Sequence, residues 1–215
     1  MQSAKVNKIF DYLSELFPEP KCELNYSSGL ELLIAIILSA QCTDVMVNKV
    51  TTELFRKYKN LSDYANADFD VLSQEIKSTG FYQNKARNVM NMARIVRDEY
   101  GGVIPAEMEK LVLLPGVGRK TASVFLAEYH GIPAIAVDTH VGRVSYRLGM
   151  TEHRDPEKIE RDLSEIWARE NWAKYHILMV LFGRYHCKAQ NPNCANCKLK
   201  SDCRSKKQGG KNVFR

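Results

Sequence analysis

The chain has 215 residues, of which 45% are hydrophobic and 26% are charged, and its formal net charge is +6. This composition is typical of a soluble globular protein with a substantial core, built as one domain or two small ones. The longest apolar run, residues 30–40, contains Glu31 and is too short to cross a bilayer. The first ten residues have no apolar signal-peptide core, so we expect a cytoplasmic protein without membrane contacts.

The positive charge is concentrated at the C-terminal end. Residues 183–215 contain nine Lys or Arg against one acid, Asp202, which gives this segment a net charge of +8 and leaves the rest slightly acidic. A basic segment on a near-neutral body favours a polyanionic partner. Beyond about Ser205 we expect only a solvated, disordered basic tail.

Helical periodicity begins the chain. Residues 6–17 place apolar side chains on one face of a first helix, which Pro18 ends. Ser28 and Glu31 form a capping-box pattern at the start of a second helix that continues to Leu38. This second helix is apolar on nearly all sides, so we expect it to be the buried central one.

Two polar or aromatic turns follow. Residues 39–44 break the helical pattern before Thr43 or Asp44 can cap a third helix, and Gln41 has no local role in this turn. After a short helix at 68–79, Gly80 takes a C-cap position and Phe81 comes directly after it. An aromatic residue at a turn usually anchors the core, but it can also serve as a wedge inserted into DNA.

The remaining elements are also helical. A long helix is expected at 84–100, an extended buried link at 134–137, and further helices at 140–148, 156–168 and 172–186. No strand or hairpin pattern is convincing. The sequence therefore predicts an all-α protein of about ten helices.

The stretch LPGVGRKTA at 114–122 joins two short apolar helices through a glycine-rich turn. A P-loop would need glycine directly before the lysine, where Arg119 stands, and a dinucleotide fingerprint would need glycine at Thr121. A helix–hairpin–helix turn over about 108–129 remains, in which Gly116 and Gly118 allow close approach and helix N–H groups hold a phosphate. An ordinary tight connection between packed helices is the alternative.

Four of the six cysteines cluster near the C-terminus, with the spacing C-x6-C-x2-C-x5-C over Cys187, Cys194, Cys197 and Cys203. Four thiolates this close in sequence can surround a zinc ion or a cubane iron–sulfur cluster. The loop lengths favour the bulkier iron–sulfur centre, and zinc stays open as an alternative. Either centre would order a lysine-rich loop that is too small to have its own core.

Two residues have the chemistry of a catalytic pair. Lys120 lies in the first turn of the second hairpin helix, where the helix N-terminus and Arg119 favour the neutral, nucleophilic amine. Its alternative role is to pair with a phosphate. Asp138 follows the buried link and precedes a helix, so it can be an N-cap and can also stabilise an oxocarbenium-like charge at a sugar C1′.

The motifs LSAQCTD at 38–44, LPGVGRKTA at 114–122, VDTHVGRV at 137–144 and the cysteine loop occur in this order. Together they resemble the endonuclease III family of helix–hairpin–helix DNA glycosylase/AP lyases, over about residues 1–207. The resemblance implies a 4Fe–4S cluster on the four clustered cysteines. It also implies a six-helix barrel at 22–132 and a cluster domain made of 1–21 and 133–215, with a DNA cleft between them.

The resemblance also assigns roles to single residues. It makes Lys120 the Schiff-base lysine and Asp138 the catalytic aspartate. Gln41 would fill the space left by a flipped base, and Phe81 falls where relatives often carry an aliphatic wedge. His140 would lie near the DNA backbone, although a structural role in ordering its loop is as plausible. The hairpin residues expected at the DNA are Gly116, Val117, Gly118 and Arg119.

The expected function is base excision repair by a monomer that binds duplex DNA in the nucleoid. Such an enzyme removes damaged, oxidised pyrimidines and cleaves the strand by β-elimination through a lysine Schiff base. An adenine-mismatch glycosylase is the nearest alternative, but that branch lacks the lysine found at Lys120. A thymine-mismatch glycosylase and a non-catalytic DNA-binding protein with a structural metal are more distant alternatives.

Overall fold

The structure is a computed structural model that describes residues 2–204, so the tail expected beyond about Ser205 lies outside the described residues. These residues form helices and no strand, which confirms the all-α prediction. The α-helices are α1 (Gln2–Leu16), α2 (Gly29–Ser39), α3 (Asp44–Lys57), α4 (Leu61–Ala65), α5 (Phe69–Glu75), α6 (Tyr82–Glu99), α7 (Met108–Leu111), α8 (Arg119–His130), α9 (Thr139–Leu148), α10 (Pro156–Ile166) and α11 (Trp172–Leu181). Three short helical segments are η1 (Lys77–Thr79), η2 (Arg169–Asn171) and the π-helical η3 (Phe182–His186).

The chain divides into two compact units. Residues Glu23–Gly131 form one unit, and the other joins the chain up to Cys22 with the chain from Ile132 onward. The first is called the hairpin unit below, because it contains α7 and α8. The second is called the cysteine unit, because it contains all four clustered cysteines. Within the described helices, none combines the length and the apolar character that a membrane crossing requires.

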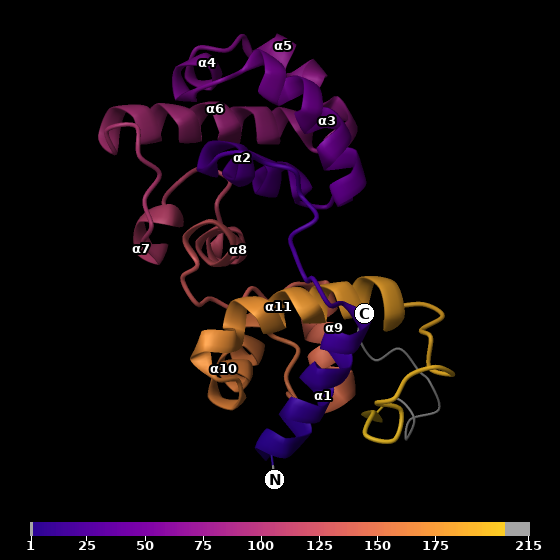
Figure 1. Ribbon diagram of the computed structural model, residues 1–215. Helices are drawn as coiled ribbons and strands as arrows, with labels where there is room; N and C mark the ends of the chain where they lie inside the picture. Colours follow the sequence, from indigo (N-terminus) through magenta and orange to yellow (C-terminus); the bar gives the residue numbers. More distant parts are fainter. Residues whose placement is uncertain (1, 205–215) are drawn as a thin grey trace. The chain divides into compact units, whose positions relative to one another are not determined.

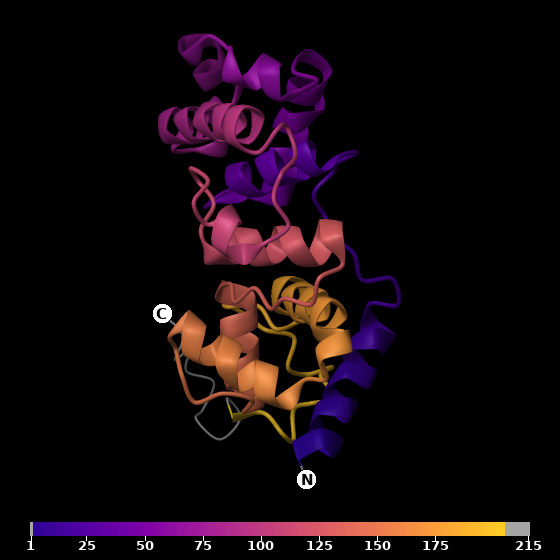
Figure 2. The same cartoon turned by 90° about the vertical axis from the view of Figure 1, so that its left-hand side faces the viewer.

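The hairpin unit is built around α2 and α6. In Figure 1, α6 runs between the α4–α5 pair and α2, and α2 in turn packs against α8; Figure 2 shows the same order from the side. Eight of the eleven residues of α2 are buried, which confirms that it is the central helix of its unit. Burial on almost every side explains why its sequence carries no polar face.

The expected helix starts follow from side-chain caps. Ser28 caps α2 by accepting a hydrogen bond from the backbone N–H of Glu31. Thr43 caps α3 in the same way, through the N–H of Met46. The Glu31 carboxylate bonds to Ser27 instead of returning to the Ser28 N–H, so the predicted reciprocal capping box is only half formed.

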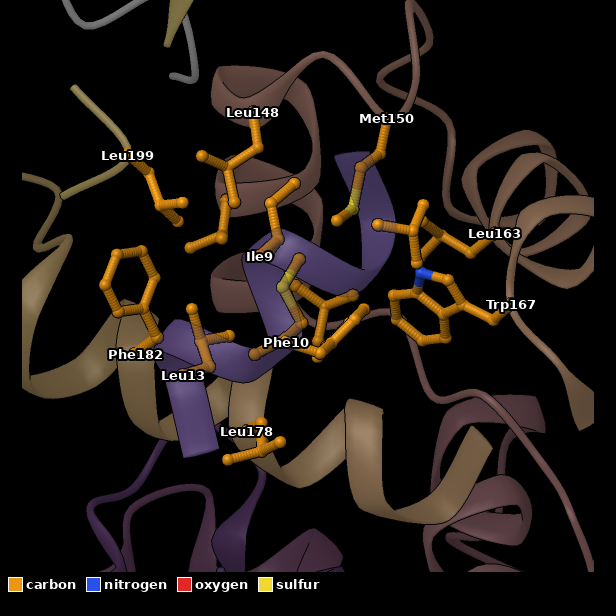
Figure 3. Close-up of a cluster of buried hydrophobic side chains, with 14 of the residues drawn as sticks. Ile9, Phe10, Leu13, Leu148, Met150, Leu163, Trp167, Leu178, Phe182 and Leu199 are labelled. Atoms are coloured by element: carbon orange, nitrogen blue, oxygen red, sulfur yellow. The ribbon is translucent and has the colours of Figure 1, made fainter. Parts of the chain in front are cut away.

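The cysteine unit has its own hydrophobic core, drawn in Figure 3. Helix α1 contributes Ile9, Phe10 and Leu13, whose side chains point into a cluster formed with α9, α10, α11 and η3. The Phe10 ring stacks on Tyr175 with centroids 3.5 Å apart and meets Trp167 edge-on at 5.4 Å. Packing of α1 against this C-terminal core explains how the first residues of the chain join its last helices in one unit.

Two of the differences from the sequence-based helix boundaries lie beside one turn. The helix predicted at 68–79 is broken into α5 and η1, and the helix predicted to start near 84 begins at Tyr82. Both differences surround the same turn, where Gly80 has a φ of 71° and Phe81 a φ of 48°. A left-handed bulky residue cannot be inferred from propensity, because only its surroundings can hold it there.

Candidate DNA-repair site

The turn between α7 and α8 presents an uncapped helix N-terminus. The chain turns through hydrogen bonds from the N–H of Leu114 to the Leu111 carbonyl and from the N–H of Val117 to the Leu114 carbonyl, each 3.0 Å long. Gly118 is the N-cap of α8, and no described side chain caps the helix at this position. The first N–H groups of α8 can therefore bind an anion from outside.

The two glycines of this turn are present for different reasons. Gly116 has a φ of 79°, and a Cβ added there would lie 2.9 Å from the Cβ of Asn88. Gly118 has a φ of −86°, and an added Cβ would meet nothing within 4 Å. The fold itself therefore requires glycine at 116, whereas at 118 any requirement for glycine must come from a ligand that approaches the backbone closely.

The side chains in and after the turn differ in their exposure to solvent. Arg119 and Lys120 are both exposed in the first turn of α8. Val117 is 4% exposed, and its side chain belongs to the core. Its backbone is the part that could still contact a strand.

Gln41 and Phe81 share an unusual backbone conformation. Among the described non-glycine residues, these two and Asn191 have a positive φ, 55° for Gln41 and 48° for Phe81. Gln41 is exposed, and the Phe81 side chain is 64% exposed, so neither side chain is a core anchor. Non-glycine residues held in this region cost about 1–3 kcal/mol each and are concentrated at functional sites.

Asp138 begins α9 in the cysteine unit. Its Oδ1 accepts a hydrogen bond of 2.7 Å from the N–H of Val141, which confirms the predicted N-cap. The carboxyl group is partly buried, and the preceding Ile135 and Ala136 are buried as expected for the apolar link. The side chain thus satisfies one of the free N–H groups at the start of α9.

His140 lies two residues further on and is half-buried. Burial lowers the pKa of His140, Asp138 raises it, and Arg143 and Arg184 lower it. Arg143 Nη2 lies 3.3 Å from His140 Nδ1, and a backbone hydrogen bond to Gly183 also involves the ring. The ring also packs against Gly183, where an added Cβ would lie 2.8 Å from the Cβ of His140.

The four clustered thiols influence one another. Burial raises the pKa of Cys197, and the neighbouring Cys187, Cys203 and Cys194 raise it further. None of the four cysteines forms a disulfide, and Cys194 is the exposed one. Within residues 2–204, no three His, Cys, Asp or Glu side chains lie close enough together to hold a single metal ion.

The surroundings of these thiols fit an anionic cluster. Arg147 Nη1 donates to Cys187 Sγ at 3.3 Å and to the Lys188 carbonyl at 2.8 Å. Arg143 reaches the Cys187 carbonyl at 3.3 Å from the same face of α9. Both arginines are buried, at 5% and 7% exposure, so they supply positive charge beside Cys187. This set of donors and charges is the one that an iron–sulfur centre uses.

Comparison with known proteins identifies the family of the chain. Residues 34–169 match the family described as HhH-GPD superfamily base excision DNA repair protein. The chain is 48% identical to endonuclease III of Bacillus subtilis (strain 168) over 90% of this chain and 89% of the relative. It is 38% identical to endonuclease III of Escherichia coli (strain K12) over 97% and 99%. The chain belongs to the endonuclease III family.

Membership in the endonuclease III family makes the protein a DNA glycosylase/AP lyase of base excision repair, as the motifs predicted. A solved structure of a trapped covalent endonuclease III–DNA intermediate matches with a TM-score of 0.93 and 45% identity, covering 97% of this chain and 99% of that chain. A thermostable thymine-DNA glycosylase matches with a TM-score of 0.85 at 20% identity over 95% of this chain and 98% of that one, which shows a shared fold alone.

Sequence reasoning missed three buried basic residues of this endonuclease III family member. Arg143 and Arg147 are spaced i, i+4 on α9, and their burial beside the cysteine loop was not expected. Lys85 is 5% exposed on α6. The sequence pattern did indicate the burial of Lys85, because this residue is in helical register with the buried Val89, Met92 and Val96.

Proposed function

We propose that this protein removes oxidised pyrimidines from duplex DNA and cleaves the strand by β-elimination, with Lys120 as the nucleophile. The observation that carries the proposal is the exposed Lys120 in the first turn of α8, directly after an uncapped helix N-terminus. A phosphate bound at that N-terminus brings the DNA strand close to Lys120, which attacks C1′ of a sugar in that strand. The hairpin unit acts as the barrel domain of the family and the other unit as its cluster domain.

Gln41 and Phe81 act where the damaged base has left the helix. Both project from left-handed turns of the hairpin unit, and both are exposed. Gln41 fills the space of the flipped base and Phe81 wedges between base pairs of the duplex. A damaged base stacks less well than an intact one, so it costs less to flip, and this difference contributes selectivity.

Lys120 and Asp138 perform the chemistry together. The neutral amine of Lys120 forms a bond to C1′ as the glycosidic bond to the base breaks, and the departing base takes up a proton. The Asp138 carboxylate stabilises the positive charge that develops on the sugar. After the sugar ring opens to a protonated imine, loss of the C2′ proton supplies the electron pair that expels the 3′ phosphate. His140, two residues after Asp138, contacts the DNA backbone in this proposal.

Cys187, Cys194, Cys197 and Cys203 would hold the 4Fe–4S cluster. When bound, the cluster supplies structural cross-linking of a loop that contains Lys188, Lys198 and Lys200. We expect isolated protein to contain iron and acid-labile sulfide in equal amounts, and the variant Cys197→Ser to lose both. Zinc without sulfide would contradict this part of the proposal.

Borohydride trapping on an abasic duplex tests the nucleophile. Wild-type protein should form a covalent adduct, Lys120→Ala should form none, and the exposed Lys59→Ala control should match wild type. A wild-type protein without an adduct, or an adduct that survives in Lys120→Ala, would overturn the lyase mechanism. The trapping reaction should follow single-site kinetics, since we propose that a monomer acts on the chromosome.

A panel of single-lesion duplexes tests the substrate class. Oxidised pyrimidines should be excised faster than adenine or thymine in mismatches, when the reactions are run at enzyme excess. A faster reaction with a mismatched normal base would contradict the proposal and favour a mismatch glycosylase.

A further inference from the structure

Lys85 is a buried lysine that the chemistry above does not use. Its side chain lies on the inner face of α6 and is 5% exposed, in helical register with the apolar Val89 and Met92. Nζ donates one hydrogen bond of 2.8 Å to the Leu38 carbonyl and another of 2.7 Å to the Thr79 carbonyl. Burying a cation is costly unless it is hydrogen-bonded, so the two carbonyl bonds are needed to keep the ammonium group at this position.

The two carbonyls belong to the segments that lead into the two exposed left-handed turns. Leu38 is in the last turn of α2, three residues before Gln41. Thr79 is the last residue of η1, two residues before Phe81. We propose that Lys85 is a positioning residue that holds Gln41 and Phe81 in register with each other by joining their turns through one ammonium group. The inference rests on the proposed roles of those two side chains in the duplex.

The electrostatics of this contact favour a lysine. The carbonyls at a helix C-terminus lack intrahelical partners and carry partial negative charge. At Lys85 the C-terminal ends of α2 and η1 direct such carbonyls at one ammonium group. Burial lowers the pKa of Lys85 and the nearby Cys42 raises it, while both carbonyl bonds favour the charged form.

Lys85 also fixes the Phe81 turn through its backbone. Its own N–H donates to the Phe81 carbonyl at 3.1 Å, the first helical bond of α6, and Phe81 has no side-chain cap. The strained φ of 48° at Phe81 is thus held from both sides, by the Nζ bond to Thr79 before it and the N–H bond after it. Residues in this conformation persist only where their surroundings over-determine them.

A comparison of two substrates tests this role. Excision from a lesion-containing duplex requires Gln41 and Phe81 to act together, whereas strand cleavage at an abasic site in single-stranded DNA requires Lys120 and Asp138 without any gap to fill. Lys85→Met keeps the apolar length of the side chain but removes the charge and both hydrogen bonds. We expect its single-turnover rate on the duplex to fall by about tenfold to a hundredfold, as misplaced contacts do, with the single-strand rate within about twofold of wild type.

A fluorescent base reports the insertion directly. 2-Aminopurine placed opposite an abasic-site analogue becomes brighter when it is unstacked, so wild-type binding should raise its emission and Lys85→Met should not. Lys85→Arg, which can still donate to two carbonyls, should recover most of the signal. The exposed Lys49→Met on α3 is the control for loss of one charge and should behave as wild type. If Lys85→Met does not fold, Lys85→Gln takes its place.

The outcomes separate this inference from the proposed function. Equal losses on duplex and single-stranded DNA, or no loss on the duplex, would overturn the positioning role of Lys85. Gln41→Ala and Phe81→Ala should lower the duplex rate selectively. If Gln41→Ala and Phe81→Ala leave the duplex rate unchanged, the proposed roles of Gln41 and Phe81 are wrong. If these two variants lower the duplex rate but Lys85→Met does not, only the Lys85 inference is wrong.

Discussion

The Asp138 carboxylate accepts a hydrogen bond of 2.7 Å from the backbone N–H of Val141, so the proposed catalytic aspartate is also the N-cap of α9. One side chain therefore has a structural role and a chemical role, and a substitution can separate them. Asparagine caps helices about as well as aspartate but carries no charge.

Asp138→Asn should accordingly preserve stability and abolish most activity. We expect the free energy of unfolding to stay within about 0.5 kcal/mol of wild type, while single-turnover excision falls by at least about a hundredfold. Asp138→Ala should lose the same activity and also about 1 kcal/mol of stability. Denaturant titration and single-turnover kinetics on both variants check this, and an active Asp138→Asn would restrict the residue to capping.

The glycines of the hairpin form a matched pair with opposite expected effects. Gly116→Ala should cost about 1–3 kcal/mol of stability, because alanine resists a φ of 79° and its Cβ would meet Asn88. Gly118→Ala should leave the melting temperature unchanged but weaken binding to duplex DNA, since its Cβ would project into open space beside the strand. Unchanged DNA binding by Gly118→Ala would contradict close approach of the strand at this residue.

His140 should make stability dependent on pH. Burial holds the pKa of His140 below its ordinary value of 6.5, so the unfolded chain takes up a proton that the folded chain resists. The free energy of unfolding should therefore be unaffected above about pH 6.5 and should fall as the pH drops further. His140→Gln should show a smaller loss between neutral and acidic pH than wild type, and the exposed His153→Gln should not differ from wild type.

Arg119 should contribute one phosphate contact to DNA binding. Arg119→Gln should weaken binding to all duplexes alike and should reduce the slope of log K against log salt by about 1. Titrations at several salt concentrations, with damaged and undamaged duplexes, measure both effects. A loss confined to damaged DNA would instead assign Arg119 to recognition of the lesion.

Several elements could be predicted from local pattern because their causes are local. Ser28, Thr43 and Asp138 each bond to an N–H three residues ahead, and such caps are readable in the sequence. The apolar character of α2 likewise indicated its burial. The Phe81 turn could not be predicted, because its left-handed backbone and the break between α5 and η1 depend on contacts with other helices.

By itself, the sequence determined the all-α class, the hairpin, the cysteine loop and the family, because spacing and residue type carry that information. Tertiary structure decided which polar groups are buried and what they touch. It places Val117 in the core, requires glycine at 116 for space, and directs two carbonyls from separate segments at Lys85 Nζ. These facts depend on residues up to 47 positions apart in the chain, and their juxtaposition exists only once the helices have packed.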